Sequence, residues 1–220
     1  MANITRRDFL KQSTYAGLAL SAPLILNAQK EKVYRTALIG SGWWGMNIAT
    51  EALDAGQSKF VALCDVDENQ LNPAVDEIEK MSGQRPNRYK DYRELLAKEK
   101  PDLVINATPD HWHALITIDA CKSGADVFVE KPIGHTIKEG RAMVNAARDN
   151  DRIVQVDTHR RVSPHNMSAI KFLQDGKAGE IGMVRAFVHY GGGPGEPTPN
   201  EEPPEGLDWD MWCGPAPYRP

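Results

Sequence analysis

The feature that most constrains this chain is a glycine-spaced segment, Gly40-Ser41-Gly42-Trp43-Trp44-Gly45, that directly follows an apolar run. The run extends from Val33 to Ile39 and has no polar alternation after Thr36, which is typical of a strand buried on both faces of a parallel sheet. Residues 43–55 then follow a helical pattern. A strand, a glycine turn and a helix in this order predict the opening unit of a layered α/β domain.

The alternation of strand and helix continues to residue 156. Further strands are predicted over residues 60–64, 87–89, 103–107, 127–129 and 153–156, and further helices over 67–81, 91–98, 110–123 and 136–150. Short apolar strands separated by helices of this length predict a doubly wound parallel sheet of the Rossmann type. We therefore expect an α/β domain with helices on both faces of its sheet.

The pattern changes after residue 156. A helix is predicted over residues 164–174 and a strand over 183–190, followed by a Pro/Gly-rich loop over 191–206 that we interpret as a mobile connection. The triple glycine in that loop lacks the Lys-Ser/Thr of a phosphate loop. A lone strand is rarely stable. We therefore expect residues 158–220 to begin an incomplete α/β substrate domain, in a fragment or in a product that lacks its C-terminal half.

The glycine segment has the spacing of a dinucleotide site. Gly40 would permit a tight turn, Gly42 would let the backbone approach a pyrophosphate, and Gly45 would let the helix pack closely on the sheet. Free N–H groups at the helix start favour an anion, and we expect all six residues of the segment to contact the cofactor. Asp65 ends the second strand about 20 residues later, where a carboxylate accepts both ribose hydroxyls. No arginine follows it, so the sequence favours NAD over NADP.

A second group of candidate residues follows the strand over 103–107. Thr108 is predicted to cap the next helix and Pro109 to occupy its first position, which places Asp110 and His113 at the carboxyl edge of the sheet. We expect all four to contact the cofactor, although the histidines could equally be surface or packing residues. His111 and His113 lie about 200° apart on a helix and cannot grip one metal ion together, so no metal is expected.

A third group, Glu130-Lys131-Pro132, follows the strand over 127–129. Burial and a neighbouring positive nicotinamide ring would lower the pKa of Lys131 toward neutrality, so that it could take a proton from a hydroxyl as hydride leaves the carbon. Acid–base help of this kind contributes about 10² to 10⁴ in rate. Spacing alone leaves open an ordinary surface Glu–Lys pair before a helix.

The N-terminus carries Arg6-Arg7, then Phe9-Leu10, then an apolar run from Tyr15 to Leu26. It resembles a twin-arginine export leader, and the alternative is an ordinary amphipathic helix. The run is shorter than the roughly 20 residues of a membrane span, so no stable span is expected. We predict a signal peptide over residues 1–28, a NAD-binding Rossmann domain over 29–157, and a periplasmic or extracellular location.

Composition narrows the remaining choices. The formal net charge is −4, which disfavours nucleic acid as a partner. Cys64, Cys121 and Cys213 follow no metal-ligand spacing and are interpreted as packing residues. Trp209, Trp212 and Tyr218 could stack on sugar rings, but aromatic residues in such a loop more often pin it to the core.

The glycine segment, Cys64-Asp65, Thr108 to His113 and Glu130-Lys131-Pro132, in this order and spacing, resemble the Gfo/Idh/MocA family of oxidoreductases. The resemblance implies that Lys131 acts at the substrate hydroxyl and that Glu130 lies near the nicotinamide ribose. It also suggests that Thr158 and Arg161 line the substrate cleft. The tail over residues 207–217 looks like a branch rich in exported members. Family members usually complete catalysis with an aspartate and a histidine in the second domain, and that part is absent here.

The leading hypothesis is an enzyme, a NAD-dependent oxidoreductase that transfers a hydride to or from a secondary hydroxyl of a sugar or cyclitol. Its partner would be a small sugar or polyol, and the full-length form would be a homo-oligomer. One alternative is a NAD-dependent glycosidase or lyase that works through transient oxidation of the sugar. The other is a truncated nucleotide-binding remnant without activity.

Overall fold

The computed structural model describes residues 32–188, 195 and 199–218. The predicted leader, residues 1–28, and most of the Gly-rich part of the predicted loop lie outside the described residues. The elements in chain order are β1 (Tyr34–Ile39), α2 (Trp43–Asp54), β2 (Ser58–Cys64), α3 (Glu68–Ser82), β3 (Asn87–Tyr89), α4 (Tyr92–Glu99), β4 (Leu103–Asn106), α5 (Asp110–Lys122), β5 (Asp126–Val129), α6 (Ile137–Asp149), β6 (Val154–Val156), the 3₁₀ turn η1 (His159–Arg161), α7 (Pro164–Gln174) and α8 (Trp209–Cys213).

The six strands form one parallel sheet in the order β3-β2-β1-β4-β5-β6. This confirms the predicted doubly wound sheet. The chain moves outward from β1 to β3 and then returns to the other side of β1 to continue with β4. At such a reversal the loops leaving the strands diverge, and open α/β sheets bind ligands in the crevice at the carboxyl ends of those strands.

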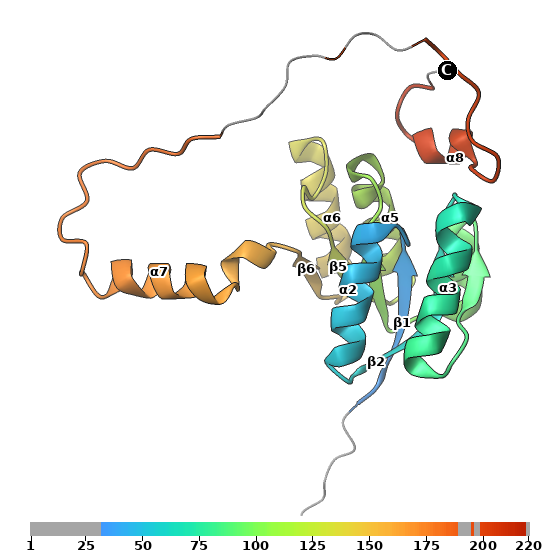
Figure 1. The fold of residues 1–220 in the computed structure, drawn as a ribbon, viewed down its shortest axis with the longest axis horizontal. Coiled ribbons are helices and arrows are strands. Elements are labelled where there is room, and N and C mark those ends of the chain that lie inside the picture. Colours follow the sequence, from blue (N-terminus) through green and yellow to red (C-terminus); the bar gives the residue numbers. More distant parts are fainter. Residues whose placement is uncertain (1–31, 189–194, 196–198, 219–220) are drawn as a thin grey trace, which may run out of the picture. The chain divides into compact units, whose positions relative to one another are not determined.

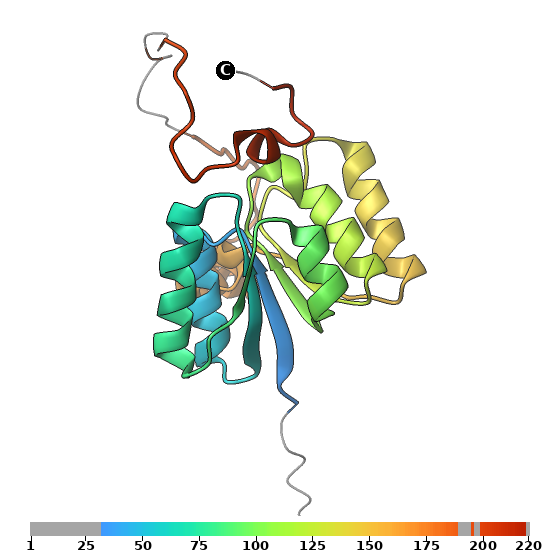
Figure 2. The same ribbon diagram turned by 90° about the vertical axis from the view of Figure 1, so that its right-hand side faces the viewer.

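Helices cover both faces of the sheet (Figures 1 and 2), with α2 and α3 on one face and α4, α5 and α6 on the other. Leu38 and Ile105 belong to the core under α2 and α3, whereas Ile39 and Val104 belong to the opposite core. Successive side chains of a strand point to opposite faces. A strand between two helical layers must therefore be apolar at every position, which explains the unbroken apolar runs.

The predicted helices are all present, and no end differs from its prediction by more than one residue. The starts of α3, α4 and α6 could be predicted from the sequence because side chains cap them. Asp67 accepts a hydrogen bond from the N–H of Asn69 at the start of α3, and Asp91 caps α4 in the same way. Thr136 and Glu139 form a capping box at the start of α6.

The strand predicted over residues 183–190 is wrong for the part that is described. Residues 183–188 adopt no regular structure, and residues 189 and 190 lie outside the described part. Val184 is 83% exposed and Phe187 is 73% exposed. A strand is stabilised by hydrogen bonds to a neighbouring strand, and this segment pairs with no strand of the described residues. An apolar pattern alone was therefore not enough to predict a strand.

The cysteines Cys64, Cys121 and Cys213 are buried and free, which confirms them as packing residues. Burial raises the pKa values of the Cys64 and Cys121 thiols, so both side chains stay neutral and unreactive. Within the described ranges, we find no helix that combines the length and the apolar character needed to cross a membrane.

Candidate functional site

The turn from β1 into α2 requires glycine at both of its ends. Gly40 has a φ of +88°, and a Cβ there would lie 2.6 Å from the carbonyl carbon of Ala107. A Cβ on Gly45 would lie 2.0 Å from the carbonyl oxygen of Gly40. A Cβ on Gly42 would meet nothing within 4 Å. The outer glycines are therefore needed to fold the turn, whereas Gly42 leaves open space beside the backbone.

The start of α2 is free to bind an anion. Gly42 is its N-cap, no side chain caps it, and its first turn contains no acidic residue. The first N–H groups of a helix have no partner within the helix, and here they border the space left by Gly42. The starts of α3, α4 and α6 are all capped by side chains. The starts of α5 and α7 also lack a side-chain cap, so it is the uncapped start of α2 together with the space left by Gly42 that fits a pyrophosphate.

Asp65 lies at the end of β2, beside this turn. Its Oδ2 accepts hydrogen bonds from the Ser41 backbone N–H at 2.7 Å and from the Ser41 hydroxyl at 3.1 Å, and its Oδ1 accepts one from the Asp67 N–H at 3.0 Å. Burial raises the pKa of Asp65 despite these hydrogen bonds. A carboxylate has about four acceptor sites. One is free, and a turn of the Ser41 hydroxyl frees another, so Asp65 fits a ribose with two hydroxyls.

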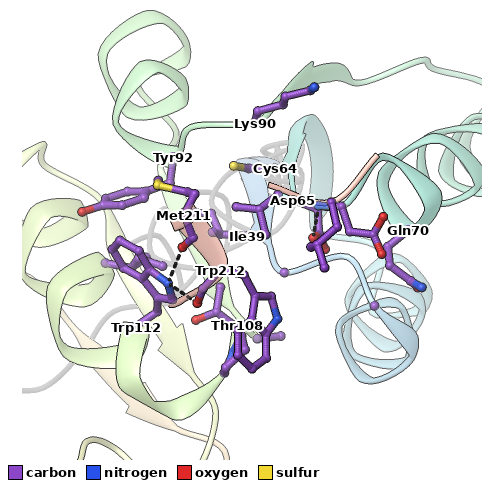
Figure 3. A pocket seen from close by; sticks show the side chains of 18 residues that line it. Ile39, Cys64, Asp65, Gln70, Lys90, Tyr92, Thr108, Trp112, Met211 and Trp212 are labelled. Carbon is purple, nitrogen blue, oxygen red and sulfur yellow. Dashed lines mark hydrogen bonds between the residues drawn. The ribbon is translucent and has the colours of Figure 1, made fainter. Parts of the chain in front are cut away.

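A cavity of about 270 Å³ opens beside Asp65 (Figure 3). Its lining is mostly apolar and includes Ile39, Tyr92, Trp112, Leu207, Met211 and Trp212. Lys90 also lines the cavity, and its Nζ pairs with Glu68 at 2.5 Å. Sequence reasoning named none of these residues as part of a cofactor site. The sequence does not show that they lie together, because they come from separate elements that meet only in the folded chain.

The loop from β4 to α5 differs from its prediction. Pro109 is the N-cap of α5 and Asp110 its first residue, so Thr108 does not cap the helix. The Thr108 hydroxyl instead donates to Asn106 Oδ1 at 2.7 Å, and the Asn106 amide donates to the His113 carbonyl at 3.1 Å. Asn106 is fully buried, and its amide group needs partners there. The Thr108 hydroxyl, which was predicted to cap the helix, therefore bonds to Asn106 instead.

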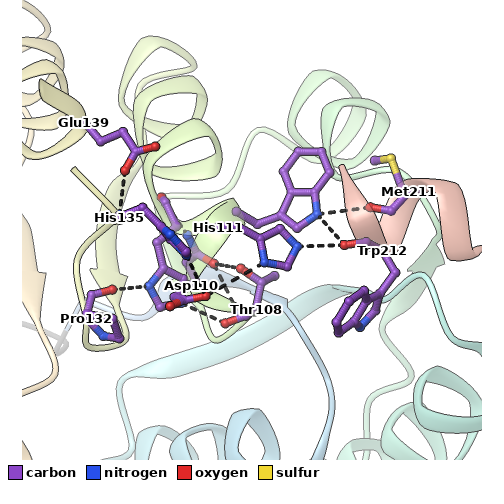
Figure 4. Close-up of polar contacts among 11 residues, drawn as sticks. Thr108, Asp110, His111, Pro132, His135, Glu139, Met211 and Trp212 are labelled. Atoms are coloured by element: carbon purple, nitrogen blue, oxygen red, sulfur yellow. Dashed lines mark hydrogen bonds and ion pairs between the residues drawn. The ribbon is translucent and has the colours of Figure 1, made fainter. Parts of the chain in front are cut away.

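The neighbouring histidines have separate partners (Figure 4). His113 is buried, and its ring nitrogens lie 2.5 Å from the Pro132 carbonyl and 2.8 Å from the Thr108 carbonyl. It thus ties the loop after β4 to the loop after β5. His111 Nε2 lies 2.8 Å from the Trp212 carbonyl. Asp110 pairs with His135 at 3.1 Å, and this contact lowers the pKa of Asp110.

Glu130 lies almost fully buried at the end of β5. It accepts hydrogen bonds from Trp44 Nε1 and from the Lys131 backbone N–H, and it also bonds to Asp157. Burial opposes its charge, but these hydrogen bonds prevail and lower the pKa of Glu130. Burial and the adjacent carboxylate raise the pKa of Asp157 to about 6. The pair therefore shares a proton below that pH.

A pocket of about 470 Å³ adjoins this pair. It is lined by Trp43, Trp44, Ala107, Thr108, Asp110, His113, Glu130, Lys131 and His159. Lys131 is exposed, so the described residues do not bury it as the sequence analysis expected. Thr158 and Arg161 are also exposed and do not line this pocket, whereas His159 does.

Glu130, Asp157 and His159 offer ligand atoms within 4.8 Å of one another, a spacing that suits a metal ion. The Glu130 oxygens already accept hydrogen bonds from Trp44 and Lys131. The side-chain hydrogen bond between Glu130 and Asp157 links the loops after β5 and β6.

Residues 34–158 match the family described as "Oxidoreductase family, NAD-binding Rossmann fold". A glycosyl hydrolase family 109 protein from Shewanella baltica is 29% identical over 215 residues, which cover 86% of this chain and 47% of the relative. Among solved structures, myo-inositol 2-dehydrogenase from Lactobacillus plantarum is 30% identical with a TM-score of 0.63, covering 68% of this chain and 43% of its own. The WlbA dehydrogenase from Chromobacterium violaceum, in complex with NADH and UDP-GlcNAcA, is 25% identical with a TM-score of 0.60, covering 68% and 41%. The chain thus spans about half the length of the curated relatives it matches.

Proposed function

The chain belongs to the oxidoreductase family with an NAD-binding Rossmann fold, and we propose that it forms the NAD-binding part of an enzyme that moves a hydride between NAD and a secondary hydroxyl of a sugar or cyclitol. The observation that carries this proposal is the alignment of three features along one crevice. They are the uncapped start of α2, the carboxylate of Asp65, and the pocket beside Glu130 and Lys131. The similar myo-inositol 2-dehydrogenase supports a polyol substrate.

In this proposal the N–H groups at the start of α2 hold the pyrophosphate, and Asp65 holds the adenosine ribose. The bound NAD supplies the hydride acceptor. Ser41 keeps the Asp65 carboxylate in place, since its N–H and hydroxyl both donate to Oδ2. Thr108, Pro109, Asp110 and His113 form the wall between the two halves of the cofactor, a role supported by the tie from His113 to Pro132.

Lys131 is proposed to take the proton of the substrate hydroxyl at its Nζ. Glu130 supports this role by accepting a hydrogen bond from the Lys131 backbone N–H at 2.7 Å, which fixes the start of the lysine's loop. Thr158 and Arg161 do not line the pocket beside Lys131, so their proposed contacts with the substrate would lie outside it.

The test is a cofactor-reduction screen on the whole protein. The protein is loaded with NAD, binding is confirmed by titration, and inositols and sugars are added while the absorbance of NADH is followed. Formation of NADH with at least one polyol is the expected result. Confirmed binding without NADH formation from any compound would reject net oxidation.

A glycosidase or lyase is the second candidate, because the similar Shewanella baltica protein is named a glycosyl hydrolase. In that reaction, oxidation of one sugar carbon by NAD would acidify the proton on the neighbouring carbon, and loss of this proton and of the leaving group would form a double bond. In a glycosidase, water would add across the double bond before the hydride returns to the sugar; in a lyase, the double bond would remain. NADH would not accumulate. Release of the phenol from an aryl glycoside, at constant NADH and dependent on NAD, would favour this candidate. If the chain is instead a truncated nucleotide-binding remnant, it would show neither activity when it is assayed beside a longer form of the protein.

We also propose that the protein is exported by the twin-arginine route to the periplasm or beyond. The order of Arg6-Arg7, Phe9-Leu10 and the apolar run supports this. Fractionation of cells that carry Arg6→Lys/Arg7→Lys should show loss of export. We further propose that residues 158–220 begin a substrate domain and that the full-length form is a homo-oligomer. Exposed apolar side chains on α7, such as Met167 and Leu173, support further packing partners.

A further inference from the structure

The segment from Glu205 to Gly214, here called the strap, lies against the loop that follows β2. The Glu68 N–H donates to the Gly206 carbonyl at 3.0 Å, and the Asp208 N–H donates to the Val66 carbonyl at 2.9 Å. Between these bonds, Leu207 forms an antiparallel bridge with Asp67. The attachment begins directly after Asp65, the residue proposed to hold the ribose.

The strap is attached a second time to α5, across the crevice (Figure 4). Trp112 Nε1 donates to the Met211 carbonyl at 3.0 Å, and His111 Nε2 lies 2.8 Å from the Trp212 carbonyl. Gly214 packs so closely on Trp112 that a Cβ would lie 2.2 Å from the indole ring. The two attachments are on opposite sides of β1, so the strap crosses the crevice at the reversal of strand order.

Leu207, Met211 and Trp212 of the strap line the same cavity as Asp65 (Figure 3). The facing lining comes from the sheet and from α4 and α5, and includes Ile39, Tyr92 and Ile116. The volume of this cavity is about 270 Å³. A flat aromatic base has two apolar faces and fits a space of this size and lining.

We propose that the strap is part of the dinucleotide site and that Leu207, Met211 and Trp212 form the outer wall against which the adenine ring packs. This rests on the proposed placement of the ribose at Asp65, because a base attached to that ribose enters this cavity. Adenine would then be held between the sheet and the strap. Removing the apolar side chains of the strap should weaken binding of the adenosine half and speed its release.

The opposite arrangement makes the opposite prediction. If the strap occupied the space that adenine needs, the cofactor would have to displace it, and truncating its side chains would tighten binding. The cavity between the strap and the sheet favours a wall over a plug, because space is present while both attachments of the strap are formed.

The test compares Leu207→Ala/Met211→Ala with the matched control Met167→Ala/Leu173→Ala, which removes the same side chains from exposed positions of α7. Binding of NAD, ADP-ribose and nicotinamide mononucleotide to the 220-residue chain is measured by calorimetry. The strap variant should bind NAD and ADP-ribose about ten-fold more weakly, with nicotinamide mononucleotide unchanged. The control should match wild type for all three.

Unchanged or tighter binding of ADP-ribose by the strap variant would overturn the inference while leaving the proposed function intact. Failure of the wild-type chain to bind NAD would overturn the proposed function itself. Trp112→Phe serves as a milder variant that keeps an aromatic ring but removes the donor to the Met211 carbonyl. It should speed dissociation of NADH several-fold in a stopped-flow displacement by excess NAD.

A measurement on the wild-type chain removes any dependence on folding of the variants. Hydrogen exchange of the amides of residues 207–214 is followed with and without saturating NAD. If the strap is a wall of the adenine site, these amides should exchange at least ten-fold more slowly with NAD, because opening the strap would expose the bound adenine to water. Equal or faster exchange would contradict it.

Discussion

The two ends of the crevice differ in how completely this chain encloses them. The cavity beside Asp65 has walls from the sheet, from α4 and α5, and from the strap, and its lining is mostly apolar. The pocket beside Glu130 is larger, is lined by charged and aromatic side chains, and leaves Lys131 exposed. This chain by itself thus supplies the walls of the cavity in which the adenosine half of NAD is proposed to bind. The chemistry at the nicotinamide end needs further walls, which a substrate or a second domain would supply.

The largest effect is expected at the open pocket. In the whole protein, Lys131→Ala should lower the rate of hydride transfer by about 10² to 10⁴ and NAD affinity by much less, because Lys131 is predicted to contact the cofactor but to act mainly on the proton of the substrate. Lys138→Ala, which removes an exposed lysine from α6, is the control. A parallel loss of NAD affinity in Lys131→Ala would instead make cofactor binding the main role of the lysine.

The glycine turn separates folding from binding. Gly45→Ala forces a Cβ to within 2.0 Å of the Gly40 carbonyl oxygen, so the free energy of unfolding should fall by about 3 kcal/mol. Gly42→Ala meets nothing within 4 Å and should change it by less than about 0.5 kcal/mol. Urea unfolding measures both variants.

NAD affinity should nevertheless fall in Gly42→Ala by about ten-fold or more, since the added methyl group lies where the pyrophosphate is proposed to approach the backbone. Calorimetry at equal protein stability checks this. A Gly42→Ala variant with wild-type affinity would remove the start of α2 from the site.

The enclosed cavity should respond to pH through Asp65. The pKa of this carboxyl is raised by burial, so it takes up a proton at a higher pH than an ordinary aspartate and then loses its acceptor for the ribose. NAD affinity should therefore fall as the pH is lowered through this raised pKa. In Asp65→Asn the affinity should be about ten-fold weaker at neutral pH and flat over the same range. Asp54→Asn, at an exposed position of α2, should keep the wild-type profile.

The smallest effect concerns the carboxyl pair below the open pocket. Asp157 has a pKa raised from 3.8 to about 6, so the folded state binds more protons than the unfolded state between about pH 4 and pH 6. From this group, stability should decrease as pH rises through that window, whereas Glu130, with its lowered pKa, acts in the opposite sense. Asp157→Asn should abolish a decrease on the order of 1 kcal/mol. Thermal unfolding across this pH range, with Asp149→Asn as control, would measure it, and an unchanged slope would contradict the pairing.

The sequence by itself determined the parallel sheet, the positions of its helices, the glycine turn and the presence of Asp65 and Glu130 at strand ends. These features follow from local causes, since apolar periodicity, capping side chains and glycine spacing act over a few residues. Each of them can therefore be predicted from a short stretch of the sequence.

Only the tertiary structure decided which residues meet across the crevice. Thr108 lost its predicted capping role because the buried amide of Asn106 claimed its hydroxyl, and residues 183–188 formed no strand because the described residues pair no strand with them. Leu207 and Met211 reached the cavity beside Asp65 through hydrogen bonds between segments about a hundred or more residues apart in the chain. Contacts of that range depend on the packing of distant elements, so no local pattern in the sequence records them.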